Sequence, residues 1–135
     1  MLILSKEHKN KLHDLGVEAL YLFGSRAQGI DGPLSDYDFA VLTKKESDRR
    51  GWAIYDAIYD LLSPFCPRTQ KNDVIDIVFL RHAPLELKMH IVRYGQVLFD
   101  ENPRARAKFE EETTLLYCDF RPILDIFDKA ILKTL

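Results

Sequence analysis

Residues 17–42 read VEALYLFGSRAQGIDGPLSDYDFAVL, and this stretch decides the fold that we predict. It contains an apolar segment at 17–23, a turn rich in glycine and polar residues at 24–35, and a segment at 36–42 that is apolar after an acidic start. Both segments are short and rich in strand-forming residues, which is typical of strands buried on both faces. The stretch therefore predicts two adjacent buried strands, with polar residues where the turn joins them.

The remaining sequence predicts helices around these strands. Ser5 can cap a helix over 6–15, and apolar residues at helical spacing indicate two more, over 49–62 and 84–95. Residues 73–80 form the clearest strand of the sequence and 96–100 a short additional one. We therefore expect an α+β fold in which a small mixed β-sheet is flanked by helices. The core is expected to include the aromatic residues of the 49–62 helix, Trp52, Tyr55 and Tyr59.

The C-terminal segment, 103–135, has a helical pattern. Pro122 is expected to break or kink it, which gives two pieces, 104–120 and 123–135. We expect about half of its large apolar residues to complete the domain's own core, and the excess to form a partner or self-association surface. These residues are Leu115, Leu116, Phe120, Ile123, Leu124, Ile126, Phe127, Ile131 and Leu132. The chain is thus expected to be one domain, 1–135, with a catalytic core at 15–100 and a partner interface at 103–135.

Length and composition narrow the classes of function. A chain of 135 residues with 47% hydrophobic and 30% charged residues fits one globular domain and is not typical of disorder. A net charge of −2 argues against direct nucleic-acid binding, which needs a basic surface. Two cysteines cannot build a disulfide scaffold, and no apolar run reaches the length that spans a membrane. We therefore expect a soluble, cytoplasmic protein.

Asp36 and Asp38 are the first candidate functional residues. Side chains two positions apart on a strand project from the same face, so these two carboxylates lie side by side. Like charges at this separation repel each other unless a cation lies between them. The pair therefore predicts a site for a hard divalent cation such as Mg²⁺, which takes carboxylate ligands and completes its shell with water and substrate phosphates.

The turn after the first strand supplies candidate phosphate ligands. Gly24 allows close backbone approach, the Ser25 hydroxyl and nearby N–H groups can hold phosphate oxygens, and Arg26 adds a fixed positive charge. Ten residues separate Ser25 from Asp36. A phosphate cradle beside a carboxylate pair predicts metal-dependent attack on a nucleotide phosphate.

A third candidate carboxylate lies on the strand predicted at 73–80. Asp73 and Asp76 are three positions apart, so they face opposite ways. Asp73 stands at the polar start of the strand and needs no special explanation, whereas Asp76 has apolar neighbours on both sides, where an unpaired charge is costly. We predict that Asp76 joins Asp36 and Asp38 at the metal site; the alternative is a hydrogen-bonded structural aspartate.

The complete motif resembles the polymerase-β-like nucleotidyltransferase superfamily. The resemblance covers about residues 15–100 and rests on Gly24-Ser25, ten residues, and Asp36-Tyr37-Asp38, with Arg26-Ala27-Gln28-Gly29 inside the motif and Asp76 on a later strand. The small size and the apolar C-terminal region are most similar to the minimal nucleotidyltransferase (MNT) branch, the antitoxins paired with HEPN-domain ribonuclease toxins. One departure is Gln28, which stands where many relatives carry a second basic residue.

The resemblance implies a polymerase-β palm-like fold and a set of roles for these residues. Asp36, Asp38 and Asp76 are the implied ligands of two Mg²⁺ ions, and Gly24, Ser25 and Arg26 are the implied phosphate contacts. ATP is the implied substrate, and its AMP is transferred to a tyrosine of a HEPN toxin, which is thereby neutralised within a hetero-oligomer. Asp76 is then the candidate base for the incoming hydroxyl.

Two alternatives stay open. The first is a binding-only antitoxin that masks the toxin without catalysis. The second is a small-molecule nucleotidyltransferase of the aminoglycoside type, for which 135 residues leave no second domain to enclose the acceptor.

Overall fold

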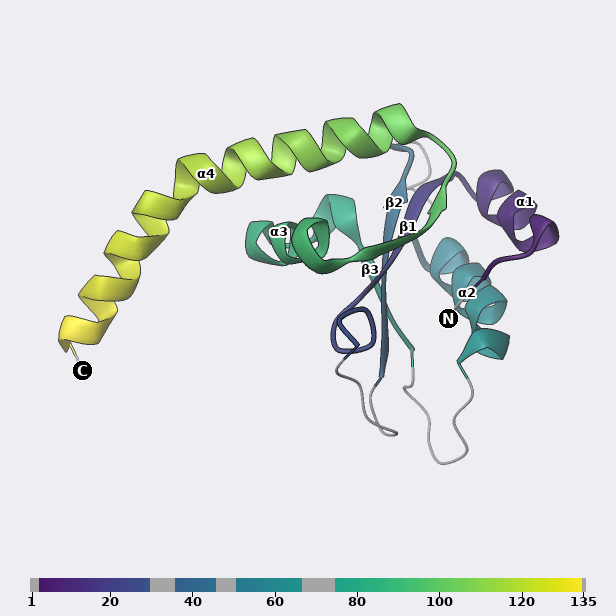
Figure 1. Ribbon diagram of the computed structural model, residues 1–135, viewed down its shortest axis with the longest axis horizontal. Coiled ribbons are helices and arrows are strands. Elements are labelled where there is room, and N and C mark those ends of the chain that lie inside the picture. The colour runs from purple at the N-terminus through teal and green to yellow at the C-terminus, as the bar shows by residue number, and fades with distance from the viewer. Residues whose placement is uncertain (1–2, 30–35, 46–50, 67–74, 135) are drawn as a thin grey trace.

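The structure is a computed structural model, and it describes residues 3–29, 36–45, 51–66 and 75–134. A four-stranded mixed sheet lies at its centre, with α1 and α2 against one face and α3 and α4 against the other (Figure 1). The α+β class predicted from the sequence is confirmed. The described residues do not include Asp73, residues 30–35 of the glycine-rich turn, or residues 46–50.

The elements follow one another almost as the sequence predicts. The helix and strand bounds are α1 Lys6–Asp14, β1 Val17–Phe23, β2 Tyr37–Thr43, α2 Gly51–Leu62, β3 Ile75–Phe79, α3 Leu85–Tyr94, β4 Gln96–Asp100 and α4 Pro103–Thr134. Short 3₁₀ turns follow α2 at Ser63–Phe65 (η2) and β3 at Leu80–His82 (η3). Ser5 caps α1 as predicted, because its hydroxyl accepts the N–H of His8 while the His8 ring accepts the N–H of Ser5.

The strand order across the sheet is β3-β2-β1-β4. β1 pairs antiparallel with both β2 and β4, whereas β2 and β3 run parallel. The register places Phe23 opposite Asp38, and Asp38 opposite Asp76. The end of β1 and the starts of β2 and β3 therefore meet at one end of the sheet.

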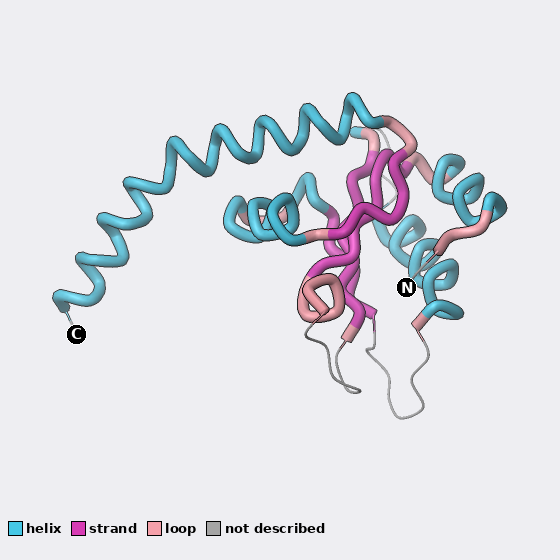
Figure 2. The backbone as a smooth tube through the Cα atoms, viewed as in Figure 1, coloured by secondary structure: helices cyan, strands magenta, loops and turns pink. Residues whose placement is uncertain are grey.

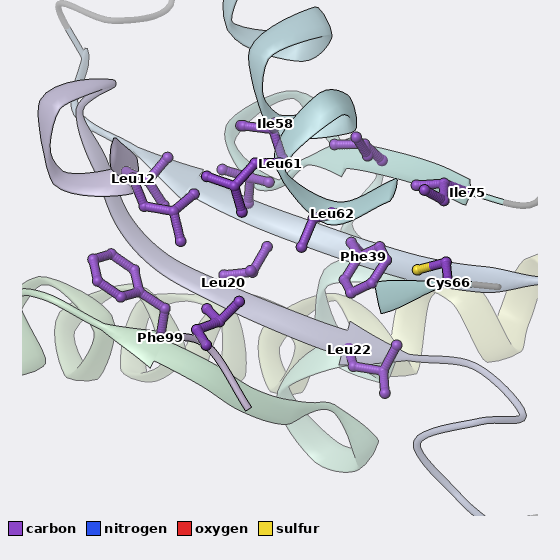
Figure 3. Close-up of a cluster of buried hydrophobic side chains, with 14 of the residues drawn as sticks. Leu12, Leu20, Leu22, Phe39, Ile58, Leu61, Leu62, Cys66, Ile75 and Phe99 are labelled. Carbon is purple, nitrogen blue, oxygen red and sulfur yellow. The ribbon is translucent and has the colours of Figure 1, made fainter. Parts of the chain in front are cut away.

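Two apolar layers hold the helices on the sheet. The larger layer packs the even-numbered side chains of β1, such as Leu20 and Leu22, against α1, α2 and β4 (Figure 3). The smaller layer lies on the opposite face, where Tyr21 and Phe23 meet Ile91 of α3 and Phe109 of α4. Because β1 carries apolar side chains on both faces, all seven of its residues are buried, as the sequence predicts.

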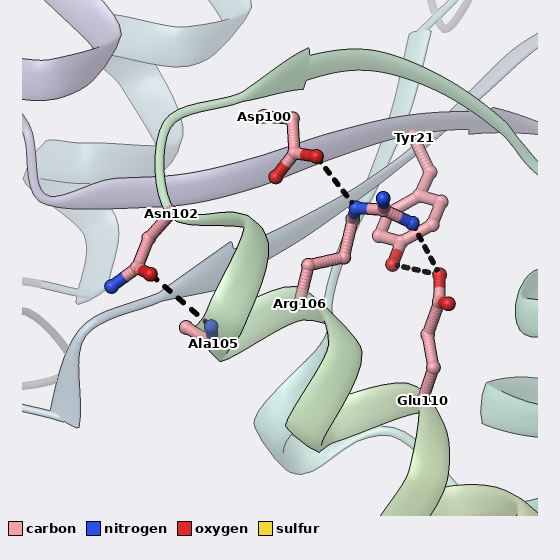
Figure 4. Close-up of polar contacts among 6 residues, drawn as sticks. All are labelled: Tyr21, Asp100, Asn102, Ala105, Arg106 and Glu110. Atoms are coloured by element: carbon pink, nitrogen blue, oxygen red, sulfur yellow. Dashed lines mark hydrogen bonds and ion pairs between the residues drawn. The ribbon is translucent and has the colours of Figure 1, made fainter.

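A polar cluster joins the start of α4 to the sheet (Figure 4). The Arg106 guanidinium donates to Asp100 Oδ2 at 2.8 Å and to Glu110 Oε1 at 3.1 Å, and the Tyr21 hydroxyl donates to the same Glu110 oxygen at 2.9 Å. Burial, followed by the hydrogen bond to Glu110, raises the pKa of Tyr21 well above its ordinary value. The cluster therefore ties α4 to both β1 and β4.

The C-terminal segment is one helix, so of the two expected effects of Pro122 the bend is observed and the break is not (Figure 1). α4 continues through Pro122, although that residue has no N–H to donate to the preceding turn. The helix leaves the body of the protein and bends on the way to its C-terminal end (Figures 1 and 2). The bend is the usual response of a helix to an internal proline.

The second half of α4 also corrects the prediction that half of its apolar residues complete the core. The described ones are all exposed, from 47% for Phe120 and Ile123 to 69% for Leu132, because the helix has left the sheet before it reaches them. α4 contacts α3 at Tyr117, whose ring centroid lies 5.0 Å from the guanidinium carbon of Arg93. Within the described residues, no helix combines the length and apolar character needed to cross a membrane.

Candidate active site

The turn after β1 packs directly against the start of β2. Gly24 has a φ of +76°, and a Cβ at this position would overlap the Oδ2 atom of Asp38. A side chain at residue 24 is therefore disfavoured twice, by the backbone conformation and by the neighbouring carboxylate. This explains why glycine stands where the strand ends: it brings the backbone of the turn into contact with a candidate catalytic group.

The turn itself is held by hydrogen bonds at both ends. The N–H groups of Gln28 and Gly29 close it onto the carbonyls of Gly24 and Arg26, at 3.3 and 3.4 Å. The side chain of Gln96, at the start of β4, donates to the Ala27 carbonyl at 2.7 Å. Sequence reasoning missed Gln96, because β4 is 69 residues from the turn and only the sheet order brings it close.

The three candidate carboxylates lie at the same end of the sheet. Asp38 is half-buried and directly opposite the exposed Asp76, and Asp36 precedes β2 by one residue. The pKa of Asp38 is raised, first by burial and then by the negative charges of Asp76 and Asp36. The carboxylates are thus close enough to repel one another. Asp76 is exposed rather than buried, because strand alternation turns only Ile75 and Ile77 toward α2.

The donor chemistry of this group fits a hard divalent cation. Three mutually repelling carboxylates gain from a positive charge between them, and carboxylate oxygen is the ligand that Mg²⁺ prefers. In the part of the chain that the structure describes, however, no three such side chains converge closely enough to hold a metal ion. The carboxylate oxygens are therefore suitable ligands for Mg²⁺, whereas the positions of the side chains in this structure do not form a metal site.

Arg26, the cationic residue of the turn, contacts an aromatic ring of β2. Its guanidinium carbon is 3.8 Å from the centroid of the Tyr37 ring, and Tyr37 stands between Asp36 and Asp38 in β2. Burial raises the pKa of the Cys66 thiol to about 11, and the positive charge of Arg26 opposes that rise, so Arg26 also lies near η2. Tyr37 thus holds the cationic group between the turn and the start of β2.

An aromatic cavity of about 410 Å³ lies between the start of α2 and the edge strand β3. It is lined by Gly51, Trp52, Tyr55, Asp76, Ile77 and Phe79. The prediction that Trp52 belongs to the core is wrong, since its side chain is 79% exposed, whereas Tyr55 and Tyr59 pack against the core as predicted. The helical spacing of Ile54, Ile58 and Leu61 could have shown this, because Trp52 lies on the opposite face of α2. Another cavity, of about 360 Å³, lies between α1 and α2 and contains none of the candidate site residues.

Known proteins resemble this chain in sequence and in fold. The family model for polymerase beta nucleotidyltransferases matches residues 6–104. The protein adenylyltransferase MntA of Aphanizomenon flos-aquae is 31% identical over 113 residues, which are 79% of this chain and 73% of that protein. This chain therefore belongs to the polymerase beta nucleotidyltransferase family.

Solved structures show the same architecture. A mutant MntA toxin–antitoxin complex matches with a TM-score of 0.58 and 25% identity over 92% of this chain and 98% of that one. A toxin–antitoxin structure with AMP-PNP matches with a TM-score of 0.57 and 24% identity, over 88% and 97%. The MNT antitoxin in complex with a tri-AMPylated HEPN toxin of Shewanella oneidensis matches with a TM-score of 0.51 and 21% identity, over 92% and 98%.

Proposed function

We propose that this chain is a Mg²⁺-dependent protein adenylyltransferase. It transfers AMP from ATP to a tyrosine hydroxyl of a HEPN-domain toxin in the cytoplasm and thereby neutralises that toxin. The observation that carries the proposal is the register of β1, β2 and β3, which sets the Gly24 turn, Asp38 and Asp76 side by side at one end of the sheet. The MntA relative, which is a protein adenylyltransferase, supports the choice of reaction.

The residues of the turn bind the nucleotide in this proposal. The Gly24 backbone and the Ser25 hydroxyl hold the β- and γ-phosphates, because no side chain at residue 24 separates them from the carboxylates. Arg26, steadied by the Tyr37 ring, offsets the negative charge of the departing pyrophosphate. The Gln96 side chain keeps the turn in place through its hydrogen bond to Ala27.

The carboxylates act at the α-phosphate. Asp36, Asp38 and Asp76 would hold two Mg²⁺ ions, which supply positive charge to the triphosphate and lower the pKa of the attacking hydroxyl. Asp76, which is exposed on the edge strand β3, accepts the proton of the tyrosine hydroxyl.

The exposed half of α4 is the proposed docking surface for the toxin. Leu116, Phe120, Ile123 and Phe127 recur at intervals of three and four residues, so they share one face of the helix. That face continues the one on which Phe109 and Thr113 pack against the body. The same surface supports a second candidate function, an antitoxin that masks its toxin by binding alone.

Transfer of radiolabel from [α-³²P]ATP to the purified toxin, with Mg²⁺ present, tests the proposal. We expect the wild-type chain to label the toxin and Asp38→Asn to lose at least about a hundredfold in rate. Asp60→Asn, a change at an exposed aspartate that lines the other cavity, should label at the wild-type rate. A wild-type chain that binds and neutralises the toxin without labelling it would favour the masking function.

A further inference from the structure

The carboxylates lie on the same face of the sheet as α3 and α4. Side chains alternate along a strand, and on this face Ala40 belongs to the smaller apolar layer and Val78 packs against it. Asp38 and Asp76 stand two positions before them on β2 and β3, so both carboxylates project from this face. The tyrosine hydroxyl that attacks the α-phosphate is therefore expected to reach the carboxylates from the side on which α3 and α4 pack.

The exposed half of α4 presents its docking surface toward that same side. In the first half of the helix, Phe109 packs against the smaller apolar layer and Thr113 is only 3% exposed, so both side chains face the body. Leu116, Phe120 and Phe127 follow at intervals of three, four and seven residues, which at 3.6 residues per turn extend the same face of the helix. Leu116 lines a small cavity between α3 and α4. The docking surface thus starts at α3 and continues beyond it.

The bend of α4 decides where this surface points. In Figures 1 and 2 the helix runs above α3 and then turns downward on the same side, toward the level of the sheet end at which the strands of the site meet. A straight helix would continue away from the sheet. α4 contains one internal proline, Pro122, and an internal proline is the usual cause of such a bend.

Pro122 is unfavourable for the helix in which it stands. In a helix interior, proline is about 3 kcal/mol less favourable than alanine, because it cannot donate an N–H and its ring crowds the preceding turn. Pro122 is exposed, and so are Phe120 and Ile123 beside it. The bend therefore does not serve to bury these side chains, and an unfavourable residue that the core does not use is typical of a functional site.

The helix beyond Pro122 is long enough to turn a small bend into a large displacement. An α-helix rises about 1.5 Å per residue, so residues 123–134 extend for about 18 Å. A bend of about 20° at the base of this segment moves its far end by about 6 Å. A misplacement of about 1 Å can already slow an enzymatic step about a hundredfold. The direction of the helix after Pro122 therefore matters for a partner that brings a reacting group to the carboxylates.

We propose that Pro122 is a positioning residue for AMP transfer: its bend turns the docking surface of α4, and the toxin bound there, toward the face of the sheet that carries Asp38 and Asp76. The proposal rests on the proposed function and specifies how its protein substrate is brought to the site. Pro122 takes no part in the chemistry, and binding of the toxin does not require it, because the apolar side chains also share one face of a straight helix. Pro122 sets the position of the acceptor tyrosine within the complex.

Binding and kinetics of the full chain test this inference. We expect Pro122→Ala to bind the toxin within about threefold of the wild-type affinity in calorimetric titration, while the rate of AMP transfer at saturating toxin falls at least about tenfold. The variant should melt no lower than the wild type, because alanine is the better helix former, so unfolding does not explain the loss. Pro103→Ala, at the exposed first position of the same helix, is the matched control and should keep both the affinity and the rate.

The direction of the bend can be tested separately from its presence. Arg121→Pro in the Pro122→Ala background moves the proline by one residue, which rotates the bend by about 100° around the helix axis. The docking surface beyond the bend then points elsewhere, so this double variant should not recover the transfer rate. A recovered rate would show that any proline in this region suffices, and it would overturn the inference.

Distances between spin labels give a measurement that does not depend on turnover. Ser63→Cys and Lys133→Cys, in a Cys118→Ser background, place one label after α2 and the other near the end of α4, while Cys66 is buried and protected from labelling. We expect the distance between the labels to lengthen by several ångströms when Pro122→Ala is added, because a straight helix points away from the sheet. An unchanged distance would contradict the inference, since the bend would then not depend on Pro122.

The outcomes separate this inference from the proposed function. A wild-type chain that labels the toxin while Pro122→Ala labels it at the same rate overturns the inference and leaves the proposed function standing. A loss of affinity as large as the loss of rate also overturns it, because Pro122 would then act in binding and not in positioning. A wild-type chain that transfers no label refutes the proposed function, and the inference with it.

Discussion

At the scale of single residues, the close approach of Gly24 and Asp38 links the backbone of the turn to a proposed catalytic group. The positive φ of Gly24 lets the chain leave β1 and turn at once, and the missing side chain leaves room for the Asp38 carboxylate. Two residues from different strands are thus fitted to each other. A substitution at either one tests the site without touching the core.

Gly24→Ala should impair catalysis more than it impairs folding. The added Cβ costs about 1 kcal/mol of backbone strain, and it also displaces the Asp38 carboxylate. We expect AMP transfer to fall at least about tenfold, because Asp38 is turned away from its working position. Label transfer and thermal melting measure the two effects separately.

Gly29→Ala is the matched control for this change. Gly29 has a similar φ of +71°, but a Cβ there meets no atom within 4 Å. The Gly29→Ala variant should lose the same amount of stability to backbone strain as Gly24→Ala does, and it should keep its AMP-transfer activity. Equal losses of activity in the two variants would show that strain in the turn, and not the position of Asp38, is what matters.

The ionised Asp38 carboxylate should lower the free energy of unfolding of the protein, although the residue is proposed to serve catalysis. Its pKa is raised in the folded protein, so the folded state takes up a proton at higher pH than the unfolded state does. The contribution of Asp38 to stability is therefore most favourable below its ordinary pKa, near pH 4, and is lost as the pH rises through the raised pKa. Asp38→Asn removes this loss, so at pH 7 without Mg²⁺ the variant should melt at a higher temperature than the wild type.

Melting curves at pH 4 and pH 7 check this expectation. The advantage of Asp38→Asn should shrink at the lower pH, where the wild-type carboxyl becomes protonated. Mg²⁺ should raise the melting temperature of the wild type and have less effect on the variant. A variant that melts below the wild type at pH 7 would contradict the repulsion that we describe among the three carboxylates.

At the scale of elements, α4 has two halves with different tasks. The first half is tied to the sheet by the cluster of Tyr21, Asp100, Arg106 and Glu110, and by the apolar contact of Phe109. The second half reaches away from the sheet (Figure 1) and exposes its large apolar side chains. The contacts between the first half of α4 and the sheet therefore decide how firmly the second half is held in position.

Arg106→Ala should weaken the fold by about 1–3 kcal/mol. The Arg106 side chain is 27% exposed, and its removal leaves the partly buried carboxylates of Asp100 and Glu110 without their cation. Lys108→Ala removes a basic residue from the same helix, but its partner Glu112 lies 4.0 Å away at the surface, so the cost should stay below about 1 kcal/mol. Urea unfolding of both variants measures the difference, and equal midpoints would show that the cluster does not hold α4.

At the scale of the whole molecule, the chain has the parts of an enzyme but little surface with which to enclose a protein substrate. The carboxylates, the turn and the aromatic cavity lie on the sheet, while the exposed half of α4 reaches away from it (Figure 1). A helix with so wide an apolar face is unusual on a protein that works alone. The shape therefore favours function within a complex.

The paired change Phe120→Glu and Phe127→Glu should abolish binding of the toxin and leave the isolated domain folded. Both side chains are largely exposed, at 47% and 62%, so charge there costs the domain little, whereas at an apolar interface it should weaken affinity at least about a hundredfold. Lys129→Glu changes the charged face of the same helix and should bind normally. Calorimetric titration with the toxin measures the affinities, and wild-type binding by the double variant would place the docking surface elsewhere.

The sequence predicted most of the secondary structure, because the signals were local. The Ser5 cap, the apolar run of β1 and the spacing of Ile54, Ile58 and Leu61 each depend on neighbours a few residues away. It went wrong where the result depends on distant contacts. The large apolar residues from Leu115 onward have no core to complete, because the helix has left the sheet before it reaches them (Figure 1).

The same division holds for the candidate site. The sequence by itself indicated metal-dependent chemistry on a phosphate, from the types and spacing of Gly24, Ser25, Asp36 and Asp38. It could do so because the ligands that a side chain offers, and the alternation of side chains along a strand, depend only on nearby residues. The sequence also predicted that Asp76 joins the carboxylates of Asp36 and Asp38. The exact register of Asp38 with Asp76, the support of the turn by Gln96 and the cavity at Trp52 were decided by the tertiary structure alone. The physical reason is that strand register and sheet order arise from packing between segments far apart in the sequence, which no local pattern specifies.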